Sequence, residues 1–167
     1  MTILEVRQQF LRDLGERLVS YSDPRHPPMQ VVVRNPSEVT WNVYLYSVTN
    51  PPGGRPADEY KVQARLPEHK RQMTGEFSRS RGGIPLLAGL QPDYMVYVLW
   101  DATLHQRITY NRNFQVKRGT ILEALTSDMS FQYSPLRSGI VETIIACTPS
   151  MLLGALDSRL PGTAPLP

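Results

Sequence analysis

The stretch Tyr94–Asp101 constrains the fold more than any other part of this 167-residue chain. It reads Tyr-Met-Val-Tyr-Val-Leu-Trp-Asp, and its apolar residues fall at both odd and even positions. Side chains of a strand alternate between two faces, so a run that is apolar on both faces indicates a central strand covered on each side. We expect helices to provide that cover. A chain of this length has room for one domain built around such a strand.

Three segments show the apolar spacing of amphipathic helices, namely residues 3–19, 120–126 and 149–156. The first two open with the Thr-x-x-Glu spacing of a helix capping box, from Thr2 to Glu5 and from Thr120 to Glu123. Helices are therefore expected at both ends of the domain and once between them.

Alternating or continuous apolar runs predict strands over residues 31–34, 41–48, 59–64, 84–88, 94–101, 114–116 and 139–147. The turn-rich stretch Asn50–Pro56 suggests that 41–48 and 59–64 pair as an antiparallel hairpin. Residues 67–83 lack apolar periodicity and are expected to form an exposed basic loop. The predicted class is α+β, a bent, mostly antiparallel sheet or half-open barrel flanked by N-terminal, middle and C-terminal helices.

Composition narrows the class of protein and its expected cellular location. With 41% hydrophobic and 20% charged residues, the chain is expected to be a soluble globular domain. One cysteine and three histidines argue against a disulfide framework and a standard structural zinc site, so we expect a cytoplasmic protein without metal or cofactor. No apolar run reaches the roughly 20 residues that span a bilayer. We expect a single domain over 1–160 and a linker-like tail over 161–167 that leads to a nuclease domain outside this chain.

The net charge of +3 hides an uneven distribution. Residues 61–118 carry ten basic and four acidic side chains, whereas the segments on either side are slightly acidic. Within this basic third, residues 105–118 contain no acid and interleave cations and amides: Arg107, Arg112, Lys117, Arg118, Asn111, Asn113 and Gln115. Cations neutralise phosphates and amides pair with base edges, so this pattern favours a nucleic-acid surface over a merely solvated edge strand.

Enzyme signatures are weak by comparison. The chain has no Walker A loop, no dinucleotide fingerprint, no nucleophile elbow and no zincin motif. Glu59 and Lys61 have the Glu-x-Lys spacing of metal-dependent nucleases, but no earlier acidic strand end accompanies them. Asp101 and His105 have the spacing of an acid/base pair, yet an Asp at a strand end more often caps the following turn.

Four short blocks, taken in order, carry a family resemblance. They are Glu59-Tyr-Lys-Val-Gln63, Leu86-Leu-Ala-Gly-Leu-Gln-Pro92, Tyr97-Val-Leu-Trp-Asp101 with His105, and Asn113-Phe-Gln-Val-Lys117. Together they resemble the N-terminal DNA-reading domain of modification-dependent (type IV) HNH restriction endonucleases, and within that group the DNA sulfur-binding domain that recognises phosphorothioate DNA. The resemblance covers roughly residues 40–147.

The resemblance implies a pocket for a sulfur-substituted phosphate. In that family an aromatic residue, a proline and a small apolar residue near the turn before the central strand surround the sulfur, and a basic residue from a later strand binds the remaining charge. Pro92 and Lys117 occupy matching positions here, Gln91 stands where an aromatic is usual, and Tyr94 is placed to take the aromatic role.

We therefore predict a non-catalytic module that reads phosphorothioate-modified double-stranded DNA for a restriction endonuclease whose HNH nuclease domain lies elsewhere. The residues expected to contact DNA are Arg79, Arg81, Gln91, Pro92, Tyr94, His105, Arg107, Asn111, Arg112, Asn113, Gln115, Lys117 and Arg118. Three alternatives stay open. They are a 5-methylcytosine reader using Tyr44, Tyr46, Trp100 or Tyr110, a metal-dependent nuclease built on Glu59 and Lys61, and a protein-interaction domain.

Overall fold

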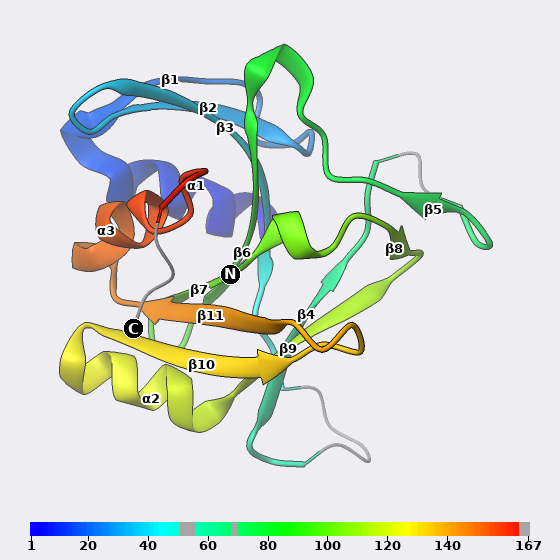
Figure 1. The fold of residues 1–167 in the computed structure, drawn as a ribbon. Coiled ribbons are helices and arrows are strands. Elements are labelled where there is room, and N and C mark those ends of the chain that lie inside the picture. The colour runs from blue at the N-terminus through cyan, green and yellow to red at the C-terminus, as the bar shows by residue number, and fades with distance from the viewer. Residues whose placement is uncertain (51–55, 68–69, 164–167) are drawn as a thin grey trace.

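A seven-stranded sheet with the order β1-β2-β3-β6-β7-β11-β10 forms the centre of the protein (Figure 1). The computed structural model describes residues 1–50, 56–67 and 70–163. The helices of these residues are α1 (Ile3–Leu14), α2 (Arg118–Ser127) and α3 (Leu152–Asp157). The strands are β1 (Leu18–Tyr21), β2 (Met29–Arg34), β3 (Glu38–Ser47), β4 (Glu59–Ala64), β5 (Thr74–Gly75), β6 (Ile84–Gln91), β7 (Val96–Trp100), β8 (Ile108–Thr109), β9 (Arg112–Lys117), β10 (Met129–Pro135) and β11 (Val141–Cys147).

Every neighbouring pair in the central sheet is antiparallel except β3 and β6, which run parallel. The sheet is not closed into a barrel: β1 and β10 are its two edges, and it curves around α1 and α3 (Figure 1). Two short ribbons, β4–β9 and β5–β8, lie outside it. The α+β class and the mostly antiparallel sheet predicted from the sequence are thus confirmed.

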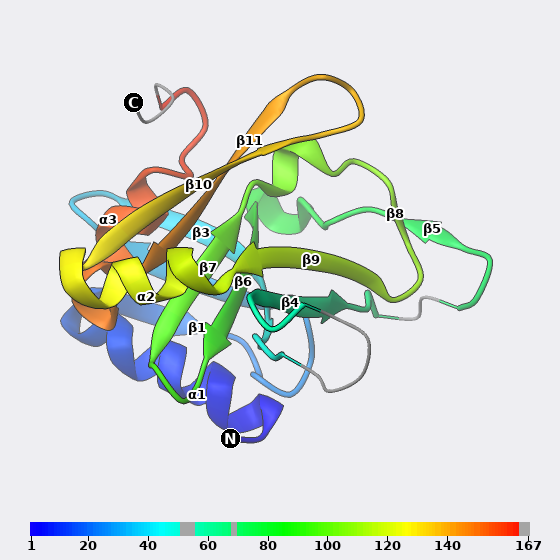
Figure 2. The same ribbon diagram turned by 90° about the horizontal axis from the view of Figure 1, so that it is seen from below.

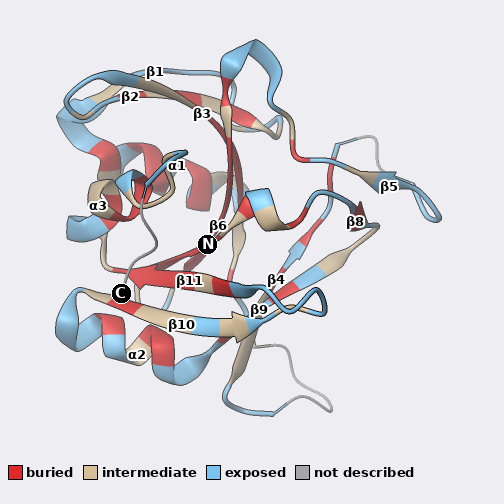
Figure 3. Cartoon of the chain, viewed as in Figure 1, coloured by how far each residue is buried: buried red, intermediate tan, exposed pale blue. Residues whose placement is uncertain are grey.

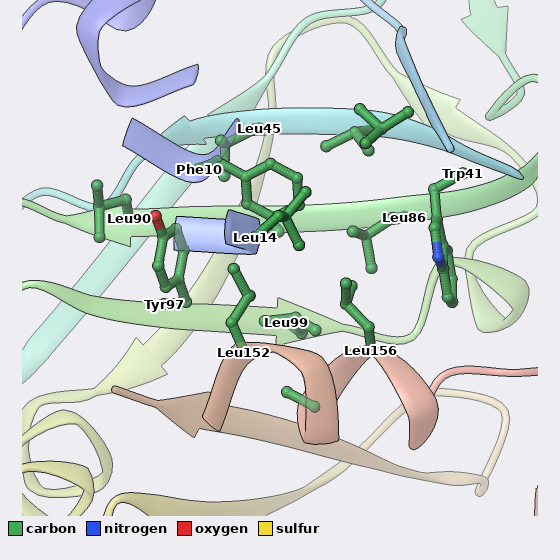
Figure 4. Close-up of a cluster of buried hydrophobic side chains, with 14 of the residues drawn as sticks. Phe10, Leu14, Trp41, Leu45, Leu86, Leu90, Tyr97, Leu99, Leu152 and Leu156 are labelled. Carbon is green, nitrogen blue, oxygen red and sulfur yellow. The ribbon is translucent and has the colours of Figure 1, made fainter. Parts of the chain in front are cut away.

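Strand β7 is the central strand that the sequence predicted. All five of its residues are at most 1% exposed. Tyr97 and Leu99 point into a cluster formed with α1 and α3, where Phe10 meets the ring of Tyr97 edge-on (Figure 4). Val98 and Trp100 point to the opposite face. That second face is covered by α2 together with the β4–β9 ribbon, so the expectation that helices cover both faces is correct for one face only.

The β4–β9 ribbon corrects the predicted pairing of 41–48 with 59–64. Strand β4 pairs antiparallel with β9, from Glu59 opposite Lys117 to Ala64 opposite Arg112, and a single bridge from Thr49 to Lys61 links it to the chain after β3. Close packing of the ribbon on the sheet depends on Gly89. A Cβ there would lie 2.5 Å from Val48 and 2.6 Å from Val62, so a larger residue would push the ribbon away.

The predicted N-terminal helix over 3–19 is too long. Its capping box forms as expected, but the helix ends at Leu14 because Gly15 adopts φ +57°, and Leu18–Tyr21 form edge strand β1. The second predicted capping box does not form. Helix α2 begins earlier, after Lys117, and the Thr120 hydroxyl instead donates to Gln132 Oε1 at 3.0 Å. Long-range contacts overrode both local signals.

Strand β10 was not predicted, although its sequence Met-Ser-Phe-Gln-Tyr-Ser alternates apolar and polar residues. Its one buried residue is the polar Ser130. The predicted loop over 67–83 contains the short strand β5 and the buried Phe77, while its residues 68–69 lie outside the described residues. The same holds for 51–55 of the predicted turn and 164–167 of the predicted tail. None of the described helices is long and apolar enough to cross a membrane.

Candidate nucleic-acid interface

The β4–β9 ribbon has two chemically different faces. Val62, Ala64, Phe114 and Val116 are at most 3% exposed and pack against the central sheet. Trp100 fixes this packing, since its Nε1 donates to the backbone oxygen of Gln115 at 3.0 Å. Alternation places polar and charged side chains on the outer face, with Glu59 opposite Lys117: Glu59, Lys61, Gln63, Asn113, Gln115 and Lys117.

Cross-strand contacts orient two amides on this outer face. Lys61 Nζ donates to Asn113 Oδ1 at 3.2 Å, and Arg65 Nε donates to Asn111 Oδ1 at 2.7 Å. The Arg65 guanidinium also lies 4.9 Å from the ring centroid of Tyr110. Because both amide oxygens already accept a hydrogen bond, Asn111 and Asn113 present their amino groups as donors.

A hollow of about 900 Å³ lies beside the ribbon, between the 104–115 segment and the turn that joins β10 to β11. Six of the residues predicted from the sequence line it: His105, Arg107, Asn111, Arg112, Asn113 and Gln115. Arg137 lines it from the β10–β11 turn, and no Asp or Glu belongs to the described lining. We call this hollow the basic groove. It concentrates positive charge and hydrogen-bond donors on a concave surface.

His105 is part of the floor of the basic groove. It is 6% exposed, and its Nε2 lies 3.0 Å from Oε1 of the buried Glu142 on β11. The same carboxylate oxygen accepts from the backbone N of Asp101 at 2.9 Å, and the His105 ring packs edge-on against Phe114. The His105 ring is thus held from below by Glu142 and Phe114, and its contact with DNA stays a prediction.

The opposite end of the ribbon carries Tyr94 and Arg118. Tyr94 hydrogen-bonds to the side chains of Tyr60 and Arg118, and the bond raises the pKa of the Arg118 guanidinium. Burial, followed by the influence of Tyr94, raises the pKa of the Tyr60 hydroxyl. Pro92, on the same turn as Tyr94, is half-buried. The structure thus brings the Pro92–Tyr94 turn to the Lys117 end of the ribbon, whereas the basic groove extends along β9 from Arg112 to Gln115.

Gln91 does not face outward. It is 4% exposed, its Oε1 accepts from the backbone N of Tyr94 at 2.7 Å, and its Nε2 reaches Asp93 at 3.4 Å. This side chain closes the turn between β6 and β7. The predicted base or sugar contact of Gln91 is therefore corrected to a structural role in holding Tyr94.

The two predicted arginines of the 67–83 segment separate. Arg79 lines a smaller hollow of about 220 Å³ that shares His105 and Gln106 with the basic groove. Arg81 sits on a turn that Asn42 holds by donating to the oxygens of Ser78 and Ser80, and it lines none of the hollows found among the described residues. The segment between β5 and β6 rises away from β4 and β9 (Figure 1).

The structure also places the residues of the alternative functions: an acid/base pair, a metal-dependent nuclease and a 5-methylcytosine reader. Asp101 caps its own turn by accepting from Thr103, which is the ordinary structural role, and His105 pairs with Glu142 instead. No group of three or more metal-ligating side chains occurs within residues 1–50, 56–67 and 70–163. Tyr44 and Trp100 are at most 2% exposed, so among the four aromatic candidates for a methylated base only Tyr46 and Tyr110 reach the surface.

Sequence reasoning missed Arg137, Arg65 and Glu142. Arg137 is one of two basic residues in an otherwise acidic last third, so counting charge by segments hid it. Its neighbours Pro135, Ser138 and Gly139 do mark a turn, which was the available signal. Glu142 lies within an apolar strand, where a buried acid indicates a specific partner.

The fold and the groove define an α+β domain with a basic concave surface beside a polar ribbon, and the described lining of that surface contains no acid. Residues 39–156 match the family described as methylase-associated X1, which is well over half of the chain, so the chain belongs to that family. No curated protein and no solved structure matches it. Membership links the chain to methylation and restriction systems. The narrower resemblance to phosphorothioate-reading domains stays a prediction.

Proposed function

We propose that this domain binds double-stranded DNA through the β4–β9 ribbon and the basic groove, as a reader module of a restriction system. The observation that carries the proposal is the described lining of the groove, in which Arg107, Arg112 and Arg137 converge with amides and no acid. Such a surface attracts phosphates over its whole length.

The shape of the ribbon supports duplex DNA as the partner. A two-stranded β-ribbon fits the major groove of B-DNA, which is about 12 Å wide. The outer face of β4–β9 offers donors from Lys61, Asn113 and Lys117, and the purine edge in the major groove offers the N7 and O6 acceptors. The cations of the groove then neutralise the adjoining backbone.

The finer proposal is recognition of a phosphorothioate in that backbone, with cleavage left to a nuclease domain outside this chain. It is supported by the corner where Pro92 and Tyr94 lie next to Arg118, because sulfur prefers an apolar and polarisable surface while the phosphate keeps its charge. Burying one such atom contributes about 1 kcal/mol. Selectivity above about tenfold requires that the unmodified oxygen lose hydrogen bonds in this corner.

Family membership favours one further candidate, recognition of methylated DNA. Of the four aromatic candidates, Tyr110 stacks with Arg65 beside the ribbon, and this pair supplies an apolar and cationic surface for a 5-methylcytosine edge.

Titration of matched duplexes separates these proposals. Unmodified, singly phosphorothioated and methylated duplexes would be compared by fluorescence anisotropy at several salt concentrations. We expect binding to all three, with a log-log salt slope of about −4 to −5 from about five phosphate contacts, and tighter binding to the phosphorothioate duplex. Equal affinities would remove the sulfur proposal, preference for the methylated duplex would support the second candidate, and no salt-dependent binding would overturn both.

A further inference from the structure

The turn between β10 and β11, residues 134–141, forms a narrow arm. Leu136 N donates to Ile140 O at 2.8 Å and Gly139 N donates to Leu136 O at 2.9 Å, with Gly139 at φ +86°. The arm extends past the body of the domain (Figure 2), and Figure 3 shows it exposed beyond the buried part of β11. A closed turn of this kind keeps its shape without help from neighbouring elements.

The two flanks of the arm differ. Pro135 to Ser138 line the basic groove, and the Arg137 side chain has no hydrogen bond or ion pair within the described parts of the chain. On the other flank Ile140 and Val141 are 51% and 55% exposed, and they border a second hollow of about 320 Å³. The arm is therefore a ridge with a cation on one side and aliphatic side chains on the other.

The order of surfaces matches the order of features on a DNA duplex. From the ribbon outward come the polar ribbon face, the basic groove, and the arm. On B-DNA a single phosphodiester backbone separates the wide major groove from the minor groove, which is about 6 Å across. The β4–β9 ribbon fits the major groove, and the single closed turn of the arm is narrow enough for the minor groove. The three arginines between them suit the phosphodiester backbone that separates the two grooves.

We propose that the β10–β11 arm enters the minor groove next to the major groove that holds the β4–β9 ribbon, so that the domain straddles one DNA backbone. Arg137 binds that backbone from the side opposite Arg107 and Arg112, and Ile140 makes an apolar contact with the deoxyribose wall of the minor groove. This inference rests on the proposed DNA binding. It adds a second contact surface and two residues that recognise DNA.

General features of minor-groove binding support these roles. The narrow minor groove has an enhanced negative potential that attracts arginine. Proteins that enter it commonly combine such cations with an exposed aliphatic side chain that contacts sugars or base steps. In this protein the two side-chain types stand three residues apart on one rigid turn.

The test combines two variants, R137A and I140T, with hydroxyl-radical footprinting of an unmodified duplex. Wild-type protein is expected to protect the deoxyriboses of one backbone from both its major-groove side and its minor-groove side. Netropsin, which occupies A·T minor grooves, is expected to compete with the protein. R137A should reduce the magnitude of the salt slope by about 1 and weaken binding about fivefold. I140T should lose the minor-groove protection and the competition by netropsin. I3T, which changes an exposed Ile on α1, is the matched control and should bind like wild type.

The outcomes separate the two proposals. Without salt-dependent binding of any duplex, the proposed function fails and the arm fails with it. Another outcome is that R107A weakens DNA binding while R137A and I140T leave the salt slope, the footprint and the competition by netropsin unchanged. In that case the proposed DNA binding stands and the proposed role of the arm is overturned. Circular dichroism spectra that match wild type confirm that each variant is folded.

Discussion

The N-terminal region, residues 1–38, and the ribbon side of the domain use their arginines in opposite ways. Arg25 pairs with Asp23 at 2.9 Å, Arg34 pairs with Glu38, and the buried Arg7 donates to the oxygens of Leu45 and Pro24. Around the basic groove, Arg107 and Arg137 have no acidic partner among the described residues. Charges of the first kind have partners within the protein. Those of the second kind remain available to a polyanion.

Buried contacts hold the backbone beneath the unpaired basic surface. The N-terminal pairs are exposed, and such pairs contribute little to stability. Beneath the basic groove the polar contact of His105 with Glu142 is buried. Side chains at the surface of the groove are thus free for a ligand because a buried pair and the Trp100 hydrogen bond hold the backbone below them.

The largest expected effect comes from removing Glu142. E142A leaves His105 and the backbone N of Asp101 without their buried partner, and breaking such a pair costs about 3 kcal/mol of the free energy of unfolding. Urea denaturation measures it. E38A, which breaks an exposed pair of the N-terminal region, is the control and should leave the midpoint nearly unchanged. Equal losses in both variants would contradict the comparison.

DNA affinity should separate the two regions next. The double variant R107A/K117A removes one cation from the basic groove and one from the outer face of the ribbon, so we expect binding at least about tenfold weaker and a salt slope reduced in magnitude by about 1.8. R25A/R34A removes the same charge from the N-terminal region and should bind like wild type. If both double variants weaken binding equally, net charge and not the basic groove attracts DNA.

Replacing the tryptophans one at a time compares the two faces of the sheet. W100F loses the hydrogen bond to Gln115 and leaves a buried carbonyl unpaired, which we expect to cost about 1.5 kcal/mol. W41F, on the other face, changes packing and removes no side-chain hydrogen bond among the described residues, so its cost should be smaller. Thermal and urea unfolding measure both. A larger loss for W41F would show that the ribbon does not depend on Trp100.

The smallest effect is an alkaline one on the helix-covered face. Burial raises the pKa of the Cys147 thiol to about 12, whereas an unfolded thiol ionises near pH 9. Between these values only the unfolded chain loses the proton, so stability falls as pH rises, by about 1 kcal/mol from pH 9 to 10. The difference between wild type and C147A over this pH range isolates the contribution. No difference would mean that the thiol ionises in the folded protein.

Much of the candidate interface was predictable because it lies on one continuous stretch. Residues 105–118 supply eight of the residues that line the basic groove, six of them predicted, and their spacing already showed cations and amides without acid. The inward positions of Gln91 and His105 were not predictable from residue type. Gln91 is held by a hydrogen bond from Tyr94 N, and His105 by a hydrogen bond with Glu142. Arg137 was hidden because the arginines that it faces across the groove, Arg107 and Arg112, are far from it in the sequence.

The sequence by itself determined the central strand, the α+β class and the basic middle third, because hydrophobic period and charge are local properties. Only the tertiary structure decided that β4 pairs with β9, that Gly15 ends α1, and that the β10–β11 arm stands across the groove from Arg107. Those outcomes depend on contacts between segments far apart in the chain. Strand pairing depends on which partner strand buries the whole apolar face of a strand. No local sequence pattern specifies that partner.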